Sequence, residues 1–103
     1  MTSDTPPQVL RRQAVLPDAA AAVAGLIEPL LLEAAGPGAE PVSLTLDYGL
    51  AAPPGAAVVV EAAVERATRT LVFAYGRLLT PEGGVVATGS AVFRRATEGS
   101  KAV

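Results

Sequence analysis

The apolar and polar positions divide the chain into one helical segment and several strand-like segments. Residues 19–35 are apolar around nearly the whole circumference of a helix, interrupted only by Glu28 and Glu33. A helix on a protein surface normally carries a polar face opposite its apolar stripe. We therefore expect this helix to be buried on most sides, with the strands of the chain wrapped around it.

One strand-like segment precedes the helix and four follow it. Residues 9–16 fit a short strand, and residues 42–48 alternate between apolar and polar positions. Further strands are expected at residues 57–67, 70–80 and 85–95, separated by turn-forming residues. Such turns predict an antiparallel meander of the last four strands. The expected fold class is α+β, with one long buried helix wrapped by a curved antiparallel sheet of about five strands.

Polar and turn-forming residues mark both ends of the helix. Asp18 suits an N-cap, because a carboxylate in that position accepts hydrogen bonds from the first free N–H groups. The Gly-Pro-Gly sequence at residues 36–38 predicts the end of the helix. Glu28 and Pro29 in its middle argue against a membrane span, since a charge is costly in lipid and a proline breaks a backbone hydrogen bond.

Length and composition indicate one small domain. The chain has 103 residues, which we assign to a single domain over residues 1–103, with residues 1–8 and 97–103 expected to be flexible. Half of the residues are hydrophobic, which is a high share for a domain that buries only about two-thirds of the surface of its unfolded chain. This excess predicts a homodimer or tetramer. No targeting segment is recognisable, so we expect a cytoplasmic protein.

Charge and residue types exclude several classes of function. The net charge is −2 and there is no run of Lys or Arg, so no nucleic-acid partner is expected. The sequence contains neither Cys nor His, which removes thiol nucleophiles, Ser-His-Asp triads and the usual metal ligands. We expect no metal and no bound cofactor. Any chemistry must depend on carboxylates, hydroxyls, basic side chains or backbone groups.

Three motifs follow the helix: DYGLAAPPG at residues 47–55, RATRTL at residues 66–71 and EGGVVATG at residues 82–89. Together with the apolar helix, they resemble the hot-dog fold superfamily, and in particular acyl-CoA thioesterases of the phenylacetic-acid-degradation type. The resemblance covers residues 16–96. It implies a hot-dog fold and hydrolysis of an acyl thioester such as acyl-CoA, whose CoA moiety is part of the substrate.

Glu28 stands where these thioesterases carry a catalytic acid, after the apolar sequence Gly-Leu-Ile. Burial penalises the charged form of a carboxyl and raises its pKa, which would suit a general base near neutral pH. Asp18 is the alternative, since related thioesterases carry an Asp just after the first strand, although an N-cap is its simpler role. Glu33 lies about 140° from Glu28 around the helix, so the two carboxylates are not expected to form a pair.

The resemblance also implies groups that bind the substrate. Backbone N–H groups at a helix N-terminus polarise a carbonyl and stabilise an oxyanion. The residues in this position are Ala20, Ala21 and Ala22. Arg66, Arg69, Arg94 and Arg95 are candidates for contacts with the phosphates of CoA, and Arg66 and Arg69 are the ones expected to make them.

One departure from the family bears on activity. Where its members often have a His-Gly-Gly turn, residues 19–21 are Ala-Ala-Ala. Two functions therefore stay open: an enzyme that hydrolyses acyl thioesters, and a non-catalytic hot-dog protein that binds an acyl chain or serves as an assembly subunit. Hydratases of the same fold use a His, so the absence of His disfavours that reaction.

Overall fold

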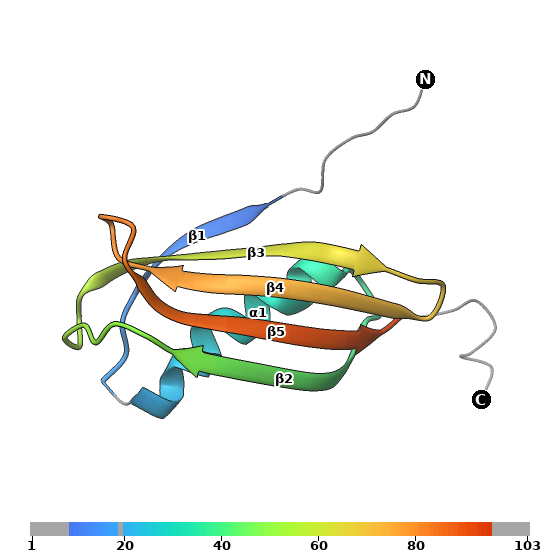
Figure 1. Ribbon diagram of the computed structural model, residues 1–103, viewed down its shortest axis with the longest axis horizontal. Helices are drawn as coiled ribbons and strands as arrows, with labels where there is room; N and C mark the ends of the chain where they lie inside the picture. The colour runs from blue at the N-terminus through green and yellow to red at the C-terminus, as the bar shows by residue number, and fades with distance from the viewer. Residues whose placement is uncertain (1–8, 19, 96–103) are drawn as a thin grey trace, which may run out of the picture.

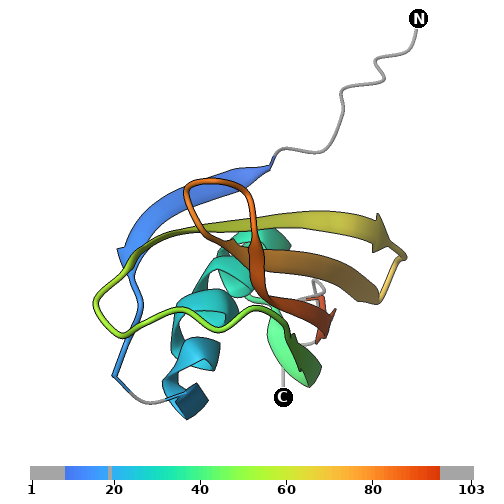
Figure 2. The same ribbon diagram turned by 60° about the vertical axis from the view of Figure 1, so that its left-hand side comes forward.

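One helix packs against one five-stranded antiparallel sheet, which confirms the expected α+β class (Figure 1). The computed structural model describes residues 9–18 and 20–95, so the expectations for residues 1–8, 97–103 and Ala19 lie outside the described part of the chain. In chain order the elements are β1 (Leu10–Val15), the 3₁₀ helix η1 (Ala20–Val23), α1 (Ala24–Ala35), β2 (Glu40–Tyr48), β3 (Ala57–Ala67), β4 (Leu71–Leu79) and β5 (Val85–Arg94). The sheet curves around α1, which lies on its concave side (Figure 2).

The order of the strands differs from the expected meander of four. The order is β1-β3-β4-β5-β2, so only β3, β4 and β5 follow one another as neighbours. After β2 the chain first stays against β5, because Gly49 donates its N–H to the carbonyl of Val86 and Leu50 donates to that of Val85. Residues 49–56 then lead across to β3, and β2 is left as an edge strand, opposite the edge strand β1.

Helix α1 buries one face rather than most of its circumference, so that expectation is wrong for a single chain. Ile27 and Leu31 are fully buried and Leu30 is 5 % exposed. Glu28 is exposed on the side of α1 that the sheet leaves open. Because one sheet covers only one side of a helix, the side of α1 that carries Glu28, Leu32 and Glu33 stays uncovered within one chain.

Two glycines on neighbouring strands let the helix approach the sheet closely. Gly76 of β4 and Gly89 of β5 are register partners. A Cβ atom at Gly89 would lie 3.1 Å from Cγ2 of Ile27, and one at Gly76 would lie 3.2 Å from Cδ2 of Leu31. Both distances are shorter than an optimal contact between carbon atoms. The methyl groups of the helix therefore occupy the space that side chains would fill at these positions.

The two ends of the helix differ in how well the sequence predicted them. At the C-terminal end, Gly36 has a positive φ of 105° and donates its N–H to the carbonyl of Leu32, as the Gly-Pro-Gly sequence predicts. At the N-terminal end, α1 begins only at Ala24, and its N-cap is Val23, without a side-chain cap. Asp18 lies too early in the chain to cap α1, so its predicted N-cap role there is wrong. In the described part of the chain, no helix has the length and apolar character needed to cross a membrane.

Candidate functional site

A cavity of about 380 Å³ lies where β2 ends and the helical segment begins. Its lining comes from the approach to η1, from the end of β2 and the loop that follows, and from β5. The lining residues are Leu16, Pro17, Asp18, Val23, Tyr48, Gly49, Leu50, Ala51, Ala52, Pro54 and Val86. Most of these side chains are apolar, so the cavity suits an uncharged apolar group.

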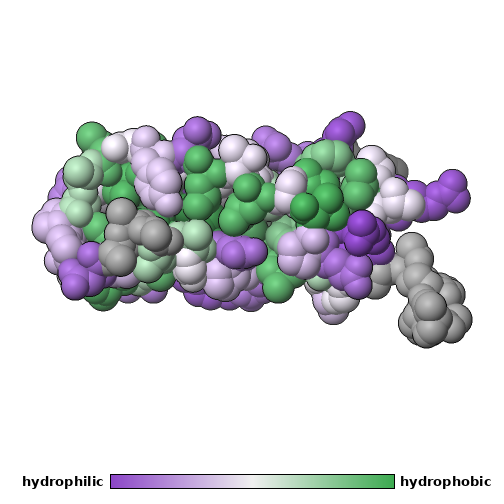
Figure 3. Space-filling model, turned by 90° about the horizontal axis from the view of Figure 1, so that it is seen from below, coloured by the Kyte–Doolittle hydropathy of each residue, from purple (hydrophilic) through white to green (hydrophobic). Residues whose placement is uncertain are grey.

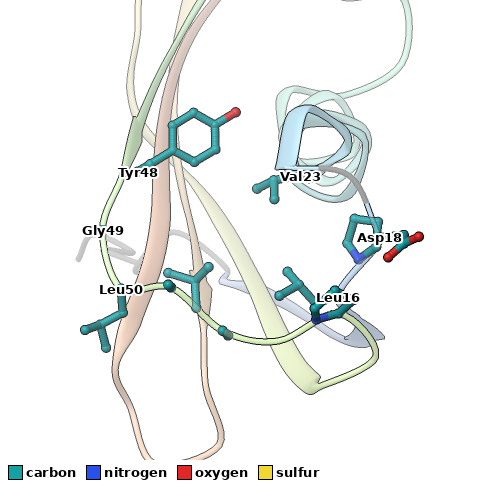
Figure 4. Close-up of a pocket in the computed structure, with 11 residues that line it drawn as sticks. Leu16, Asp18, Val23, Tyr48, Gly49 and Leu50 are labelled. Carbon is teal, nitrogen blue, oxygen red and sulfur yellow. The ribbon is translucent and has the colours of Figure 1, made fainter.

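The polar side chains of this lining do not all face the space. Tyr48 and Val23 point toward one another across it, and Leu16 points in from below (Figure 4). The carboxylate of Asp18 points away from the other labelled side chains (Figure 4). The tyrosine hydroxyl is therefore the polar side-chain group directed into the gap between strand and helix.

Glu28 lies outside this lining, on the exposed side of α1. Glu33 shows which side of α1 faces which edge of the sheet. Its carboxylate accepts a hydrogen bond of 2.7 Å from Arg12 on β1, so the Glu33 side of α1 faces the β1 edge. Glu28 is about 140° away around the helix, so it faces the other edge of the sheet, that of β2. The expected role of Glu28 as a base depended on its burial, and in the single chain Glu28 is not buried.

The N-terminal turns of the helical segment border the cavity through Val23. Ala20, Ala21 and Ala22 belong to the 3₁₀ helix η1 and not to α1. The first N–H groups of a helical segment lack partners within the helix, and α1 has no side-chain cap. Their use as an oxyanion site therefore stays a prediction.

Arg66 and Arg69 lie at the opposite end of the sheet from the cavity. The cavity reaches Pro54, shortly before β3 begins, whereas Arg66 lies near the end of that strand. Strand β3 has 11 residues and spans about 33 Å from its first to its last Cα atom at ~3.3 Å per residue. The guanidinium of Arg66 lies 4.4 Å from the centroid of the Phe73 ring. Within one chain, these arginines and the cavity belong to two separate regions.

The outer face of the sheet carries an ion-pair row across three strands. Arg11 of β1, Glu61 of β3 and Arg77 of β4 are register neighbours. Oε2 of Glu61 lies 2.6 Å from Nη2 of Arg11, and its Oε1 lies 2.8 Å from Nη2 of Arg77. These hydrogen bonds, first that from Arg11 and then that from Arg77, lower the pKa of Glu61 below its ordinary value of 4.5.

The Glu61 row predicts a change of stability with pH. A lowered pKa means that the carboxylate stabilises the fold above pH 4.5, and that this contribution disappears as the pH falls through the lowered pKa. Urea unfolding should therefore give a free-energy difference between wild type and Glu61→Gln that is largest near about pH 7 and shrinks toward about pH 3. A difference that grows on acidification would contradict this role of Glu61.

No group of three or more acidic residues in residues 9–18 and 20–95 is arranged to hold a metal ion. This finding concerns only the described residues, and the sequence supplies no Cys or His ligand at all. The polar groups at the cavity end are the carboxylate of Asp18, the Tyr48 hydroxyl and backbone N–H groups.

Comparison with solved structures decides the architecture. The structure of mouse thioesterase superfamily member 2 matches with a TM-score of 0.77 and 19% sequence identity, over 92% of this chain and 80% of the mouse chain. The chain has the hot-dog fold. This hot-dog chain also matches a phenylacetic acid degradation-related protein of Ralstonia eutropha, with a TM-score of 0.69 and 20% identity over 84% of this chain and 75% of the other.

The hot-dog fold also occurs in a protein with a different reaction. An (R)-hydratase of A. caviae matches with a TM-score of 0.64 and 20% identity, over 93% of this chain and 100% of the hydratase. The sequence matches no protein-family model and no curated protein. The fold is therefore shared with thioesterases and with a hydratase, so the fold by itself does not assign a reaction to this chain.

Sequence reasoning missed Tyr48 and the loop at residues 49–54 as part of the site. The alternation of residues 42–48 places Tyr48 on one face of its strand with Val42, Leu44 and Leu46. The structure directs Tyr48 toward Val23 from the end of the edge strand β2, where it is 57 % exposed. The available signal was the Ala-Pro-Pro-Gly turn after Tyr48. The loop that contains this turn is longer than a tight hairpin, which indicates that the strands on either side of it are not direct neighbours. Binding residues often lie on such longer loops.

Proposed function

We propose that this hot-dog protein binds an acyl thioester such as acyl-CoA and hydrolyses it as a homodimer, with Glu28 as the general base. The observation that carries the proposal is the position of Glu28, on the exposed side of the central helix and facing the free edge strand β2. A carboxylate there is open to water, which is the nucleophile that a general base must activate. The apolar cavity at the start of the same helical segment supplies room for the acyl group.

The reaction class is favoured by what the residues are able to do. Hydrolysis of a thioester needs a carboxylate, a water molecule and donors for the developing oxyanion. Unpaired N–H groups near Ala20, Ala21 and Ala22 would serve as those donors. A hydratase mechanism that depends on His has no residue to use in this sequence.

The homodimer is proposed on the exposed edge of the sheet. Val42 and Tyr48 of β2, and Leu50 just after it, are about half exposed. Figure 3 views the molecule from the β2 side, where green hydrophobic areas lie along the surface among polar ones. Pairing of β2 with its own copy across a two-fold axis would satisfy its free backbone groups and cover these side chains.

We expect light scattering at micromolar concentration to report a homodimer or a tetramer. The physical reason is that an uncovered apolar edge strand is an association site in water. Replacing Val42 by Lys should shift the protein toward the monomer, because it places a charge in the proposed interface; Val9→Lys, at an exposed position before β1, is the matched control. A wild-type monomer would contradict the homodimer and any site shared between subunits.

A hydrolysis screen across short, long and aromatic acyl-CoAs tests the enzymatic proposal. A non-catalytic acyl-binding or assembly protein is the second candidate. It is favoured by the Ala-Ala-Ala sequence at residues 19–21 and by the outward direction of the Asp18 carboxylate (Figure 4). Binding of acyl-CoA without any turnover would support this second candidate. Turnover of any member of the panel would support the first.

A further inference from the structure

Tyr48 carries the side-chain hydrogen-bond donor in the lining of the cavity. The other lining residues are aliphatic or glycine, except for Asp18, whose ionised carboxylate only accepts hydrogen bonds. Tyr48 is exposed and points across the space toward Val23 (Figure 4). Among the lining residues of the described chain, the Tyr48 hydroxyl is therefore the only side-chain group that is able to donate a hydrogen bond to a bound molecule.

The lining of the cavity contains no Lys or Arg. Neither residues 13–65 nor residues 78–93 contain a basic residue, and every residue that lines the cavity belongs to one of these two segments. Arg12 and Arg77 directly precede these segments, and both are in ion pairs with carboxylates elsewhere on the sheet and helix. A negative charge that develops in the cavity of one chain must therefore be stabilised by neutral O–H and N–H donors.

Helix α1 and strand β2 run side by side, which places Glu28 near Tyr48. Ile27 of α1 and Leu46 of β2 reach the same point of the sheet, because a Cβ atom at Gly89 would lie 3.1 Å from a methyl group of each. Glu28 is the residue after Ile27, and Tyr48 lies two residues after Leu46, about 7 Å along the strand. A carbonyl group held at Tyr48 would therefore lie close to a water molecule that Glu28 activates.

We infer that the Tyr48 hydroxyl donates a hydrogen bond to the carbonyl oxygen of the acyl thioester and stabilises the oxyanion that forms on it. This inference rests on the proposed function and adds a catalytic residue to it. A donor fixed where negative charge develops lowers the reaction barrier, because the charge appears in the transition state and not in the substrate. Tyr48 thus adds a side-chain donor to the backbone N–H groups proposed above.

Tyr48 keeps its proton throughout the inferred reaction. The oxygen of water bonds to the carbonyl carbon, and one water proton passes to Glu28. The electron pair of the C=O π bond moves to the carbonyl oxygen, which accepts the hydrogen bond from Tyr48. This pair then re-forms the C=O bond, the C–S bond breaks, and the leaving sulfur takes the proton from Glu28. The products are a carboxylic acid and a thiol.

Tyr48→Phe tests the inference, since this substitution removes the hydroxyl and keeps the ring. We expect kcat for acyl-CoA hydrolysis to fall at least ~10-fold while KM changes less than ~2-fold, because the hydrogen bond is strongest in the transition state. An unchanged kcat would overturn the inference. A rise in KM at constant kcat would also overturn it, because the hydroxyl would then act only in substrate binding.

Tyr75→Phe is the matched control. Tyr75 is the other tyrosine of the sequence, is exposed on strand β4, and does not line the cavity. It lies two residues before Arg77 and so shares the outer face of the sheet with it. Both kcat and KM of Tyr75→Phe should stay within ~2-fold of wild type. An equal loss of kcat in the two variants would overturn the inference.

Calorimetry with two thioethers of CoA separates this inference from the proposed reaction. One thioether carries a trifluoromethyl ketone, whose hydrate resembles the tetrahedral intermediate, and the other carries a propyl group in its place. Neither contains a thioester, so the protein is not able to hydrolyse them. We expect Tyr48→Phe to bind the ketone at least ~10-fold more weakly than wild type, and the propyl thioether with less than a ~2-fold change.

This pattern of affinities would support the placement of the Tyr48 hydroxyl at the carbonyl oxygen even if wild type hydrolyses no acyl-CoA, a result that would contradict the enzymatic proposal alone. Equal changes in affinity for the two thioethers would overturn the inference, because the hydroxyl would then not distinguish a carbonyl group from an alkyl group. Failure of wild type to bind the ketone would overturn it as well.

Discussion

Replacing Glu28 by Gln is expected to reduce kcat for acyl-thioester hydrolysis at least ~10²-fold, the typical loss when a general base is removed. Gln keeps the size and hydrogen-bonding reach of Glu but cannot accept the proton of the attacking water. Glu28 is exposed, so the free energy of unfolding should change by no more than about 0.5 kcal/mol. Steady-state kinetics together with urea melts on the same preparation check both parts.

Asp18→Asn is the control for Glu28→Gln. The carboxylate of Asp18 points away from the cavity, and it does not cap α1 (Figure 4). This substitution should therefore leave both kcat and stability near their wild-type values. Full activity in Glu28→Gln together with a loss in Asp18→Asn would move the catalytic acid to the start of the helical segment.

Truncating Ile27 or Leu31 to Ala is expected to lower the free energy of unfolding by about 2–5 kcal/mol. Both side chains are fully buried against the sheet, so truncation removes apolar contacts and leaves a cavity. A loss of this size is a large share of the stability of a small domain. Urea unfolding monitored by circular dichroism measures it directly.

Leu32→Ala is the matched control for the core truncations. Leu32 lies next to Leu31 in the chain but is 39 % exposed. In the separated monomer its truncation should cost much less than that of Leu31. Equal losses for Leu31→Ala and Leu32→Ala would show that the helix does not bury a single face in the way described.

Local patterns in the sequence predicted the elements well. The strand expected at residues 57–67 coincides with β3. Of its expected inward positions, Val58, Val60 and Ala62 are buried and Val64 is half-buried. Alternation fixes which face of a strand is apolar, so these positions follow from the residues alone. The end of α1 at Gly36 followed from the need for a residue that tolerates positive φ.

Long-range features were not predictable in the same way. Alternation along β2 does not reveal whether its neighbour is β3 or β5, because the hydrogen bonds of either pairing look alike in sequence. The apolar character of residues 19–35 was read as burial within one chain, whereas α1 covers only one face there. The sequence pattern alone does not show how much of an apolar helix one sheet is able to cover, so it did not predict that Glu28 is exposed in the single chain.

The glycine pair beneath the helix also limits where a substrate is able to bind. A sheet that curves around a helix invites the idea of an acyl chain threaded between the two layers. With Ile27 and Leu31 seated directly over Gly76 and Gly89, that interlayer space is already filled by the protein's own methyl groups. For the acyl thioester that we propose as substrate, a long acyl chain would therefore have to run along the outside of the helix or toward the proposed second subunit, and the interior of the fold would not set the preferred chain length.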